Sequence, residues 1–485
     1  MMIYILIALL VLILAWRWFM QRKLPPGPWG LPVLGYLPFL NPKAPHETLT
    51  ALARKYGKVY GLHLGSVYTV VLSDPAMIMS AFSKEKVTGR APLYVTHGIM
   101  GGYGIICAEG NMWRVHRKFV SKCLRLFGAT KASGVKTQRV EELILREIGD
   151  CVSNIKVDRL VDPCQHLQHS VGSIMCDLIF GKTWSKDDQT WMWLQHLQEE
   201  GTKLIGVTGP LNFLPFFRFF PKYKNVMSFL LDGKHKTHKV YEELIERQRL
   251  ICSGKNDDDP ENVIQAFLRE LEITNEGEYF SNIQFYHLLA DLFGAGLDTT
   301  LTTLRWYFLY MAAYPEIQEQ IHEELDRVLG KRPPSLEDVQ LLPLTQAAIA
   351  ETQRIRSVVP LGIPHATTDD IQLFGHLLPK NTMIIPLQWA VHMDPMVWKN
   401  PEEFNPKRFL NEDTKYFKPK EFIPFQTGKR MCIGEDLANM VMFLFASNIL
   451  QQFEVSKTND VVDLDGEIGI SLTPKHQILS FKSRS

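Results

Sequence analysis

One cysteine lies in a setting suited to metal chemistry. Cys432 falls within the run Phe-Gln-Thr-Gly-Lys-Arg-Met-Cys-Ile-Gly over 425–434, directly before a helical pattern over 435–445. Glycines on both sides permit backbone positions with positive φ and the close approach of a flat partner. A thiolate at a helix N-terminus is stabilised by the helix dipole and by backbone N–H donors. The pattern therefore favours an ionised metal ligand over the alternative, a buried structural cysteine.

A second segment places an acid beside an alcohol inside a helical pattern. Residues 295–300 read Ala-Gly-Leu-Asp-Thr-Thr, near the middle of a helical pattern over 281–313. A glycine inside a helix costs about 1 kcal/mol relative to alanine, and threonine can divert a backbone carbonyl and bend the helix. Asp298 and Thr299 are unusual in a helix that only packs. A helix–helix contact at the small residues is the alternative.

Two further pairs have helical spacing, and a single arginine lies between them and the cysteine segment. Glu351 and Arg354 are three residues apart and Trp113 and Arg117 are four apart, so each pair shares one helix face. Arg408 follows in the run Pro-Lys-Arg-Phe, before the cysteine segment. Taken singly, such pairs are commonly surface contacts.

The cysteine segment is similar to the haem-binding loop F-x-x-G-x-R-x-C-x-G of cytochromes P450. The chain as a whole resembles the microsomal, family-2-related clan of that superfamily. The resemblance implies haem b with Cys432 as axial thiolate, and Asp298 and Thr299 in oxygen activation and proton delivery. It implies a structural ion pair of Glu351 with Arg354 and Arg408. The other cofactor-binding residues that it implies are Arg90, Trp113, Arg117, Ala295, His365, Phe425, Arg430 and Gly434.

The haem propionates explain several of these residues, because two carboxylates beside apolar surface require cationic or hydrogen-bonding partners. The resemblance assigns Arg90, Arg117, His365 and Arg430 to that role, with Trp113 on the same helix face as Arg117. For His365 the alternative is a satisfied core histidine.

The resemblance implies a monooxygenase that inserts one atom of O2 into a C–H bond of a lipophilic substrate. The segments over 89–94 and 101–110 resemble arthropod ecdysteroid hydroxylases, and the segment over 425–432 is similar to the 25-hydroxylase type, so we expect a steroid, an ecdysteroid precursor oxidised at carbon 25. Apolar walls suit such a ligand. The expected substrate contacts are Phe213, Phe216, Val359, Leu361 and Leu472.

Two other functions are compatible with the fold that the resemblance implies. One is a P450-fold isomerase or dehydratase that needs no reductase, and the other is a non-catalytic, membrane-tethered haem- or steroid-binding protein. Asp298 and Thr299 argue against both, because neither function needs delivered protons.

The chain has no flavin or iron–sulfur motif of its own, so a partner must supply the electrons. The resemblance to the microsomal class implies NADPH–cytochrome P450 reductase, with cytochrome b5 as a second candidate. Arg114, Lys118 and Arg125 share a helical stripe and Lys429 flanks Cys432. We expect these four residues to form a basic docking face for the acidic reductase. A solvated basic face is the alternative.

The first residues read as a membrane anchor. Residues 1–16 are almost wholly apolar and residues 18–20 extend the run, and a spanning helix needs about 20 such residues, so residues 1–22 are the expected anchor. Arg17, Arg22 and Lys23 follow the apolar run, which favours a cytosolic body over a cleaved signal peptide. Residues 23–45 form a proline-rich hinge and 46–485 the haem domain. The expected location is the endoplasmic reticulum membrane, with the catalytic domain on the cytosolic side.

Composition and periodicity agree with this interpretation. The 485 residues carry 53 Lys+Arg and 52 Asp+Glu, a net charge of +1 that argues against nucleic-acid binding by bulk charge. Seven cysteines are too few for a disulfide scaffold. Helical patterns cover 140–155, 240–252, 281–313 and 317–329, and strand patterns cover 59–64, 68–72, 371–374, 383–385 and the last twenty residues. We predict one mainly α domain with a minor β part.

Overall fold

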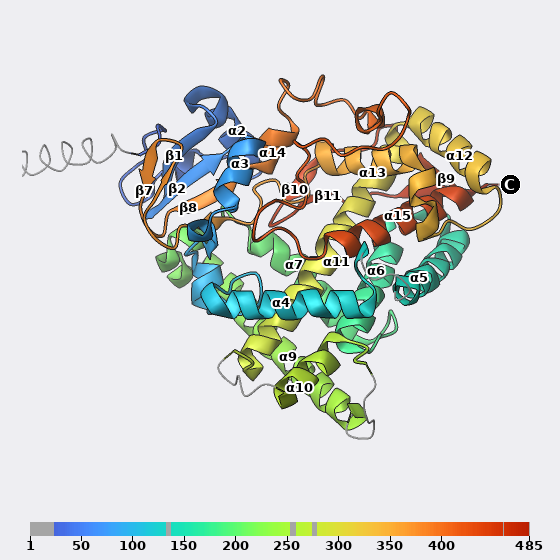
Figure 1. Cartoon of the computed structure of the whole chain (residues 1–485), viewed down its shortest axis with the longest axis horizontal. Coiled ribbons are helices and arrows are strands. Elements are labelled where there is room, and N and C mark those ends of the chain that lie inside the picture. Colours follow the sequence, from blue (N-terminus) through green and yellow to red (C-terminus); the bar gives the residue numbers. More distant parts are fainter. Residues whose placement is uncertain (1–23, 132–136, 253–258, 274–278, 459, 485) are drawn as a thin grey trace, which may run out of the picture.

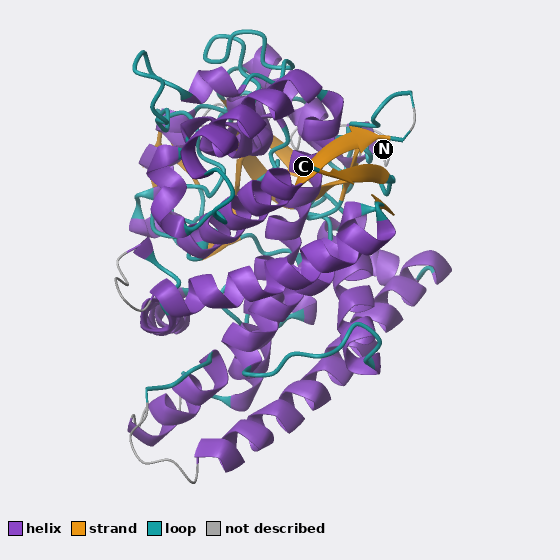
Figure 2. Ribbon diagram, turned by 90° about the vertical axis from the view of Figure 1, so that its right-hand side faces the viewer, coloured by secondary structure: helices purple, strands orange, loops and turns teal. Residues whose placement is uncertain are grey.

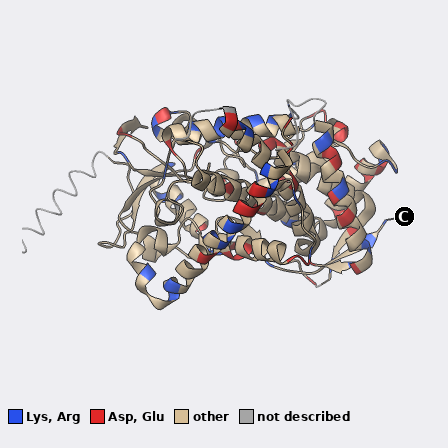
Figure 3. Cartoon of the chain, turned by 90° about the horizontal axis from the view of Figure 1, so that it is seen from below, with Lys and Arg blue, Asp and Glu red and all other residues tan. Residues whose placement is uncertain are grey.

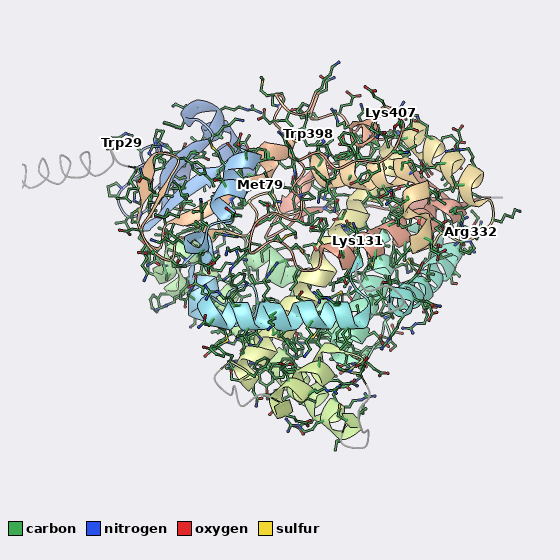
Figure 4. The ribbon with its side chains drawn as sticks, viewed as in Figure 1. Trp29, Met79, Lys131, Arg332, Trp398 and Lys407 are labelled. Atoms are coloured by element: carbon green, nitrogen blue, oxygen red, sulfur yellow. The ribbon has the colours of Figure 1, made fainter. Side chains whose placement is uncertain are left out.

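The computed structural model describes residues 24–131, 137–252, 259–273, 279–458 and 460–484. The predicted anchor over 1–22 and the first hinge residue lie outside these ranges. Among the described helices, none combines the length and the hydropathy that a membrane crossing requires. The described part of the hinge consists mostly of turns. Trp29 in this segment is 69% exposed and lies at the edge of the body (Figure 4).

Helices dominate the molecule, as the sequence predicted (Figures 1 and 2). Several begin at a proline behind a capping side chain; Asp162, for example, accepts a hydrogen bond from the backbone of Cys164. The α-helices are α2 (Pro45–Tyr56), α3 (Pro75–Phe82), α4 (Gly110–Phe127), α5 (Thr137–Asp158), α6 (Pro163–Phe180), α7 (Gln189–Leu204), α8 (Pro210–Phe213), α9 (Pro221–Cys252), α10 (Val263–Ile273), α11 (Asn282–Ala313), α12 (Pro315–Leu329), α13 (Pro343–Ile355), α14 (Gln388–His392) and α15 (Glu435–Gln452). The shorter turns are η1 (Leu37–Phe39), η2 (Glu85–Val87), η3 (Tyr94–Ile99), η5 (Pro215–Phe219), η6 (Leu336–Leu341) and η7 (Pro406–Phe409).

The strands form a minor part, gathered mainly at one side of the body (Figure 1). A five-stranded sheet has the order β1-β2-β8-β5-β3, in which only β2 and β8 run parallel. Its strands are β1 (Val59–Leu64), β2 (Val67–Leu72), β3 (Gly89–Arg90), β5 (His365–Ala366) and β8 (Met383–Pro386). The smaller sheets contain β4 (Leu160–Val161), β6 (Ile371–Leu373), β7 (His376–Leu378), β9 (Phe453–Lys457), β10 (Gly466–Ile468), β11 (Leu472–Pro474) and β12 (Leu479–Ser483).

Helix α11 organises the core. It crosses the middle of the body (Figure 1) and packs against α6, α13 and α15. Most of its second half is buried, including Trp306 and Phe308. The Ser281 hydroxyl accepts a hydrogen bond from the backbone of Gln284 at its start, and Pro315 follows its end. The segment over 295–300 therefore lies inside a helix that is held on several sides.

The predicted elements are largely confirmed. The patterns over 140–155, 281–313 and 317–329 correspond to α5, α11 and α12, and the predicted strands over 59–64 and 383–385 are β1 and β8. The pattern over 240–252 covers only the last part of α9, which begins at Pro221. Gly233, inside this helix, has a poor helix propensity, but a side chain there would come within 2.4 Å of Leu197 Cδ1. The glycine is thus a packing contact with α7.

A buried ion pair joins α13 to the chain that precedes the cysteine segment. The Arg354 guanidinium meets Glu351 through Nε at 2.7 Å and Nη2 at 2.8 Å, and both side chains are fully buried. Arg408 Nε donates to the same carboxylate at 3.2 Å. Arg354 also donates to the carbonyls of His392 and Pro401, each at 2.8 Å. One carboxylate thus connects α13 and η7, and Arg354 extends the connection to the end of α14.

Removing the Glu351 charge is expected to destabilise the fold. Glu351→Gln leaves Arg354 buried without a countercharge, and breaking a buried pair in this way costs roughly 3–5 kcal/mol. Urea unfolding followed by circular dichroism measures the change. Lys407→Gln is the control, since Lys407 is an exposed neighbour of Arg408 at the surface (Figure 4); its effect is expected within about 0.5 kcal/mol. Equal stability of the two variants would contradict a structural role for the ion pair.

Candidate active site

The cysteine segment folds into a loop seated on the end of α3. The backbone N–H of Cys432 donates to the Phe425 carbonyl at 2.9 Å, and that of Lys429 donates to the Phe82 carbonyl at 3.1 Å. Gly428 has a φ of +79°, and a Cβ there would come within 2.3 Å of the Phe82 oxygen. The glycine is required both by its conformation and by the close backbone contact. Gly434 then caps α15.

The seven cysteines all lie in described residues, and Cys432 alone among them is exposed. The protein around its sulfur nevertheless raises the pKa of the thiol, chiefly through burial. The backbone N–H of Gly434 and the charge of Arg117 act in the opposite direction, while Glu435 adds to the increase. The N–H at the helix start therefore favours the thiolate, as the sequence predicted, but does not by itself outweigh the effect of burial. A bound metal ion would be needed, since a coordinating thiol is deprotonated outright.

Three arginines gather beside the loop. Arg90 Nε donates to the Ile106 carbonyl at 2.7 Å, and Arg430 donates to the carbonyls of Ile106 and Ala108. The Arg430 guanidinium carbon lies 4.4 Å from the ring centroid of Trp113, and that of Arg117 lies 5.9 Å from the same centroid. The cluster thus draws together side chains from β3, α4 and the cysteine segment.

The protein around this cluster does not supply enough negative charge to balance the positive charge of its arginines. Burial lowers the pKa of Arg430 to about 8, and the charge of Arg90 adds to this effect. Burial likewise lowers the pKa of Arg90 to about 10. Glu109, which sequence reasoning missed, accepts a hydrogen bond from the Arg90 backbone and supplies one negative charge nearby. At neutral pH the cluster remains cationic and suits a ligand with two carboxylates.

His365 supplies an unused polar atom next to this cluster. Its ring is stacked on Phe82 at a centroid distance of 3.7 Å, and Nδ1 donates to the Val87 carbonyl at 2.8 Å. Nε2 is buried and has no hydrogen-bond partner among the described residues, and the same holds for Arg430 Nε. Burial, together with the charge of Arg90, holds the pKa of His365 well below its usual value. The unpaired donor Arg430 Nε fits a propionate of the haem that the resemblance implies. His365 Nε2 would donate to a propionate only in the protonated ring, a form that a carboxylate bound beside it would favour.

The acid–alcohol segment lies on α11. The Thr299 hydroxyl donates to the Ala295 carbonyl at 2.9 Å, the side-chain-to-backbone bond expected of a threonine inside a helix. A side chain on Gly296 would come within 2.3 Å of Met175 Cε on α6. The glycine therefore serves a helix–helix contact. Ala295 itself is exposed, so α11 presents an open surface one turn before Thr299.

Two carboxylates on α11 have raised pKa values. Burial raises the pKa of Asp298 to about 6, against the opposing effects of Ser471 and Arg305. Burial also raises the pKa of Asp291 to about 7. Asp291 Oδ2 accepts the backbone N–H groups of Ile105 and Ile106 at 2.7 and 2.8 Å. Sequence reasoning missed Asp291; its spacing of two helical turns from Asp298 was the available signal.

The predicted substrate residues come from several separate elements. Phe213 and Leu361 are buried in the same hydrophobic cluster. The backbone of Leu472 donates to the Val358 carbonyl at 2.7 Å, which places β11 beside the half-buried Val359. Phe216 is 45% exposed.

A hollow of about 380 Å³ lies next to Phe213, lined also by Leu93, Tyr94 and Asn212. It adjoins the cluster that contains Leu361, since Leu93 belongs to both. Of the predicted substrate residues, Phe213 thus lines this hollow and Leu361 lies in the adjoining cluster.

The predicted docking residues lie around α4. Arg114, Lys118 and Arg125 are all exposed on this helix. A hollow of about 340 Å³ runs between Arg114, Lys118 and Ile433, the residue after Cys432. Arg114 and Lys429 both form ion pairs with Glu85. Elsewhere, basic and acidic residues are interspersed along the helices of the lower face (Figure 3), as the net charge of +1 suggests.

Known proteins resemble this chain over nearly its whole length. The family model described as Cytochrome P450 matches residues 25–481. The Drosophila melanogaster protein Cytochrome P450 306a1 is 42% identical, with 94% of this chain and 88% of that protein covered. Cytochrome P450 18a1 of the same fly is 33% identical, with coverages of 100% and 92%. Cytochrome P450 2H1 of Gallus gallus is 35% identical, with coverages of 94% and 92%.

Asp291 is expected to make stability depend on pH. Its folded-state pKa of about 7 exceeds the ordinary value of 3.8, so the folded state binds this proton more tightly than the unfolded chain. The corresponding stabilisation is present in full at low pH and is lost as the pH rises through about 7. The slope is about 1.4 kcal/mol per pH unit between those two pKa values.

Asp291→Asn keeps an oxygen acceptor for the two N–H groups and removes the proton. Urea unfolding at several pH values should therefore show a flatter profile for this variant than for the wild type. Asp150→Asn, at an exposed position on α5, controls for the loss of one charge. Parallel profiles for Asp291→Asn and the wild type would contradict the assignment.

Proposed function

Because the chain belongs to the cytochrome P450 family and is therefore a haem-dependent monooxygenase, we propose that Cys432 is the axial thiolate ligand of the haem. The observation that carries this proposal is the meeting of an exposed cysteine, a cationic cluster and two orphaned buried nitrogens around one loop. Thiolate-ligated haem supplies the oxidative chemistry, in which one atom of O2 enters the substrate and the other leaves as water.

The chain's own residues bind and orient the cofactor. Arg90, Arg117, Arg430 and His365 would hold its carboxylates, with Trp113 stacked against the guanidinium of Arg430. The buried site favours charge-assisted hydrogen bonds, because each cation gains a countercharge that the protein does not provide. Phe425 and Gly434 would lie on the cysteine side of the cofactor, and Ala295 on the side of α11.

Asp298 and Thr299 would deliver protons to the reacting oxygen. A carboxyl with a pKa of about 6 exchanges its proton readily near neutral pH. The Thr299 hydroxyl donates to the carbonyl of the exposed Ala295, one helical turn away, and its oxygen can also accept a hydrogen bond. Together they would form a short relay on the face of α11.

We further propose that the substrate is a steroid, more narrowly an ecdysteroid precursor hydroxylated at carbon 25. The apolar cluster around Phe213 and Leu361 supports a lipophilic ligand. The similarity of segments 89–94, 101–110 and 425–432 to ecdysteroid hydroxylases supports the steroid class. The enzyme, reconstituted with the reductase, can be incubated with a panel of steroids and other lipids. Mass spectrometry of the products tests both the steroid class of the substrate and hydroxylation at carbon 25. Product formed from a peroxide without NADPH would instead favour the isomerase or dehydratase alternative.

The proposed electron donor is NADPH–cytochrome P450 reductase, with cytochrome b5 as an accessory donor. The basic residues around the hollow beside Ile433 support an acidic partner. The proposed location is the endoplasmic reticulum membrane, with residues 1–22 as anchor and the catalytic domain on the cytosolic side. The exposed Trp29 near the start of the described chain is typical of a membrane–water interface.

Cys432→Ala is expected to abolish the thiolate signature of the haem. The red-shifted Soret band of the carbon monoxide complex of the reduced protein depends on the thiolate, so the variant should lack it. Absorption difference spectroscopy of the purified protein makes the measurement. Cys252→Ala, at a half-buried cysteine outside the site, should retain the band. A band of normal position in Cys432→Ala would refute the ligand assignment.

Thr299→Ala is expected to uncouple NADPH consumption from product formation. Loss of a positioned proton donor typically costs 10²–10⁴-fold in rate, so product per NADPH should fall by about 10-fold or more while the haem is retained. The ratio of product to NADPH measures this. Thr299→Ser should restore coupling, and Thr303→Ala, one turn further along α11, should leave it near the wild-type value. Unchanged coupling in Thr299→Ala would contradict the relay.

A further inference from the structure

We propose that Glu85 regulates the binding of an acidic redox partner by holding two of the cations that the partner would engage. The inference rests on the proposed function, because it concerns the face through which electrons would enter. It differs from a simple basic docking face in assigning an inhibitory role to a carboxylate of this chain.

The docking groove lies between α4 and the cysteine segment. Its hollow of about 340 Å³ has Trp113 and Ile433 among its lining residues, with Arg114, Arg117 and Lys118 contributing positive charge. Ile433 directly follows Cys432, and Arg117 Nη2 donates to the Met431 carbonyl at 2.8 Å. A protein bound in this groove would therefore contact residues that are adjacent in sequence to Cys432.

Glu85 is placed at the rim of this groove by η2. One carboxylate oxygen accepts from Arg114 Nη2 on α4, and the other accepts from Lys429 Nζ of the cysteine segment at 2.7 Å. The two cations come from different elements and share this single carboxylate. Both cations lower the pKa of Glu85, so it is ionised at any pH at which a partner would bind.

These contacts contribute little to the stability of the fold. The side chains of Glu85, Arg114 and Lys429 are 49%, 51% and 45% exposed, and exposed ion pairs contribute only about 0.2–1 kcal/mol each. The backbone of the cysteine segment is held separately, by the bond from Lys429 N to the Phe82 carbonyl. Glu85 can therefore release both cations without disturbing the loop.

An acidic partner must displace Glu85 to use these cations. Each carboxylate of the partner that pairs with Arg114 or Lys429 replaces an existing pair instead of adding one, so part of the electrostatic gain is cancelled. Lys118 on the same rim has no such intramolecular counterion among the printed contacts of the described chain. The partner chemistry that fits is a redox protein with several clustered carboxylates on its docking face.

The test compares binding affinities of the full-length, haem-loaded protein in lipid nanodiscs. The probe is NADPH–cytochrome P450 reductase, and surface plasmon resonance gives its Kd over a range of salt concentrations. Glu85→Gln should lower Kd by about 2- to 5-fold at low ionic strength, as expected for the release of exposed pairs. This gain should vanish at about 1 M salt, where the Debye length falls to about 3 Å.

The control removes an equivalent carboxylate elsewhere. Asp326 on α12 pairs with Arg484 Nη2 at 2.6 Å and is 58% exposed; α12 lies at the upper right of Figure 1, away from α4. Asp326→Asn makes the same change in net charge and should leave Kd at the wild-type value. An equal gain in both variants would assign the effect to net charge and overturn the inference.

A second background identifies the cations responsible. In the double variant Arg114→Gln, Lys429→Gln, adding Glu85→Gln should no longer improve binding, because no cation remains to be released. An unchanged Kd for Glu85→Gln in the wild-type background would overturn the inference and leave the proposed function standing. Absence of any binding by the wild-type protein would overturn both the proposed electron donor and the inference.

Discussion

Buried positive charge without a matching protein anion is the constraint on which the rest of the site depends. Arg90 and Arg430 share the Ile106 carbonyl as an acceptor, and burial, followed by the charge of Arg90, lowers the pKa of Arg430. Carbonyl dipoles and the carboxylates of Glu109 and Asp291 offset only part of the lost hydration of two guanidinium groups. The remaining negative charge has to come from a bound group. Cofactor binding and folding are therefore coupled, since a ligand that binds only the folded state stabilises it.

The same constraint explains why α11, a helix of the core, determines the backbone position of residues 105–108 beside the cofactor site. The carbonyls of Ile106 and Ala108 face the arginines only if the backbone of this loop is fixed, and Asp291 fixes it by accepting two consecutive N–H groups. Asp291 lies on α11, two turns before Asp298. One rigid helix thus determines both the acceptors that position the cationic cluster and the acid–alcohol pair. A displacement of α11 would change cofactor binding and proton delivery together.

The parts of the site that the sequence predicted are those encoded by short spacing. The segment over 425–434, the pair Trp113 and Arg117, and the pair Glu351 and Arg354 each depend on residues within one loop or on one helix face, so residue type and periodicity identify them. Glu85 is different, because its partner Lys429 is 344 positions away. No local pattern distinguishes Glu85 from any other exposed acid. Its role follows only from the packing of η2 against α4 and the cysteine segment.

Glu109 and Asp291 were also missed by the sequence analysis, in their case because burial decides their importance. In sequence each is one acid among 52 Asp and Glu residues. Their importance arises from desolvation and from the backbone groups that they accept, which are properties of the folded chain. The early half of α9 was missed for a related reason, because the contact of Gly233 with Leu197 overrides a poor local helix propensity. Tertiary contacts, which sequence periodicity does not report, decide these features.

The electrostatics of Cys432 connect cofactor loading with protection of the thiol. Burial and the charge of Glu435 raise the pKa of this exposed cysteine, so the free side chain is a protonated thiol at neutral pH. A protonated thiol reacts slowly with oxidants, because the thiolate is the nucleophile. Metal binding releases the proton and makes affinity dependent on pH. Arg117 and the Gly434 N–H then favour the thiolate. The surroundings thus disfavour an ionised sulfur until a metal is present to coordinate it.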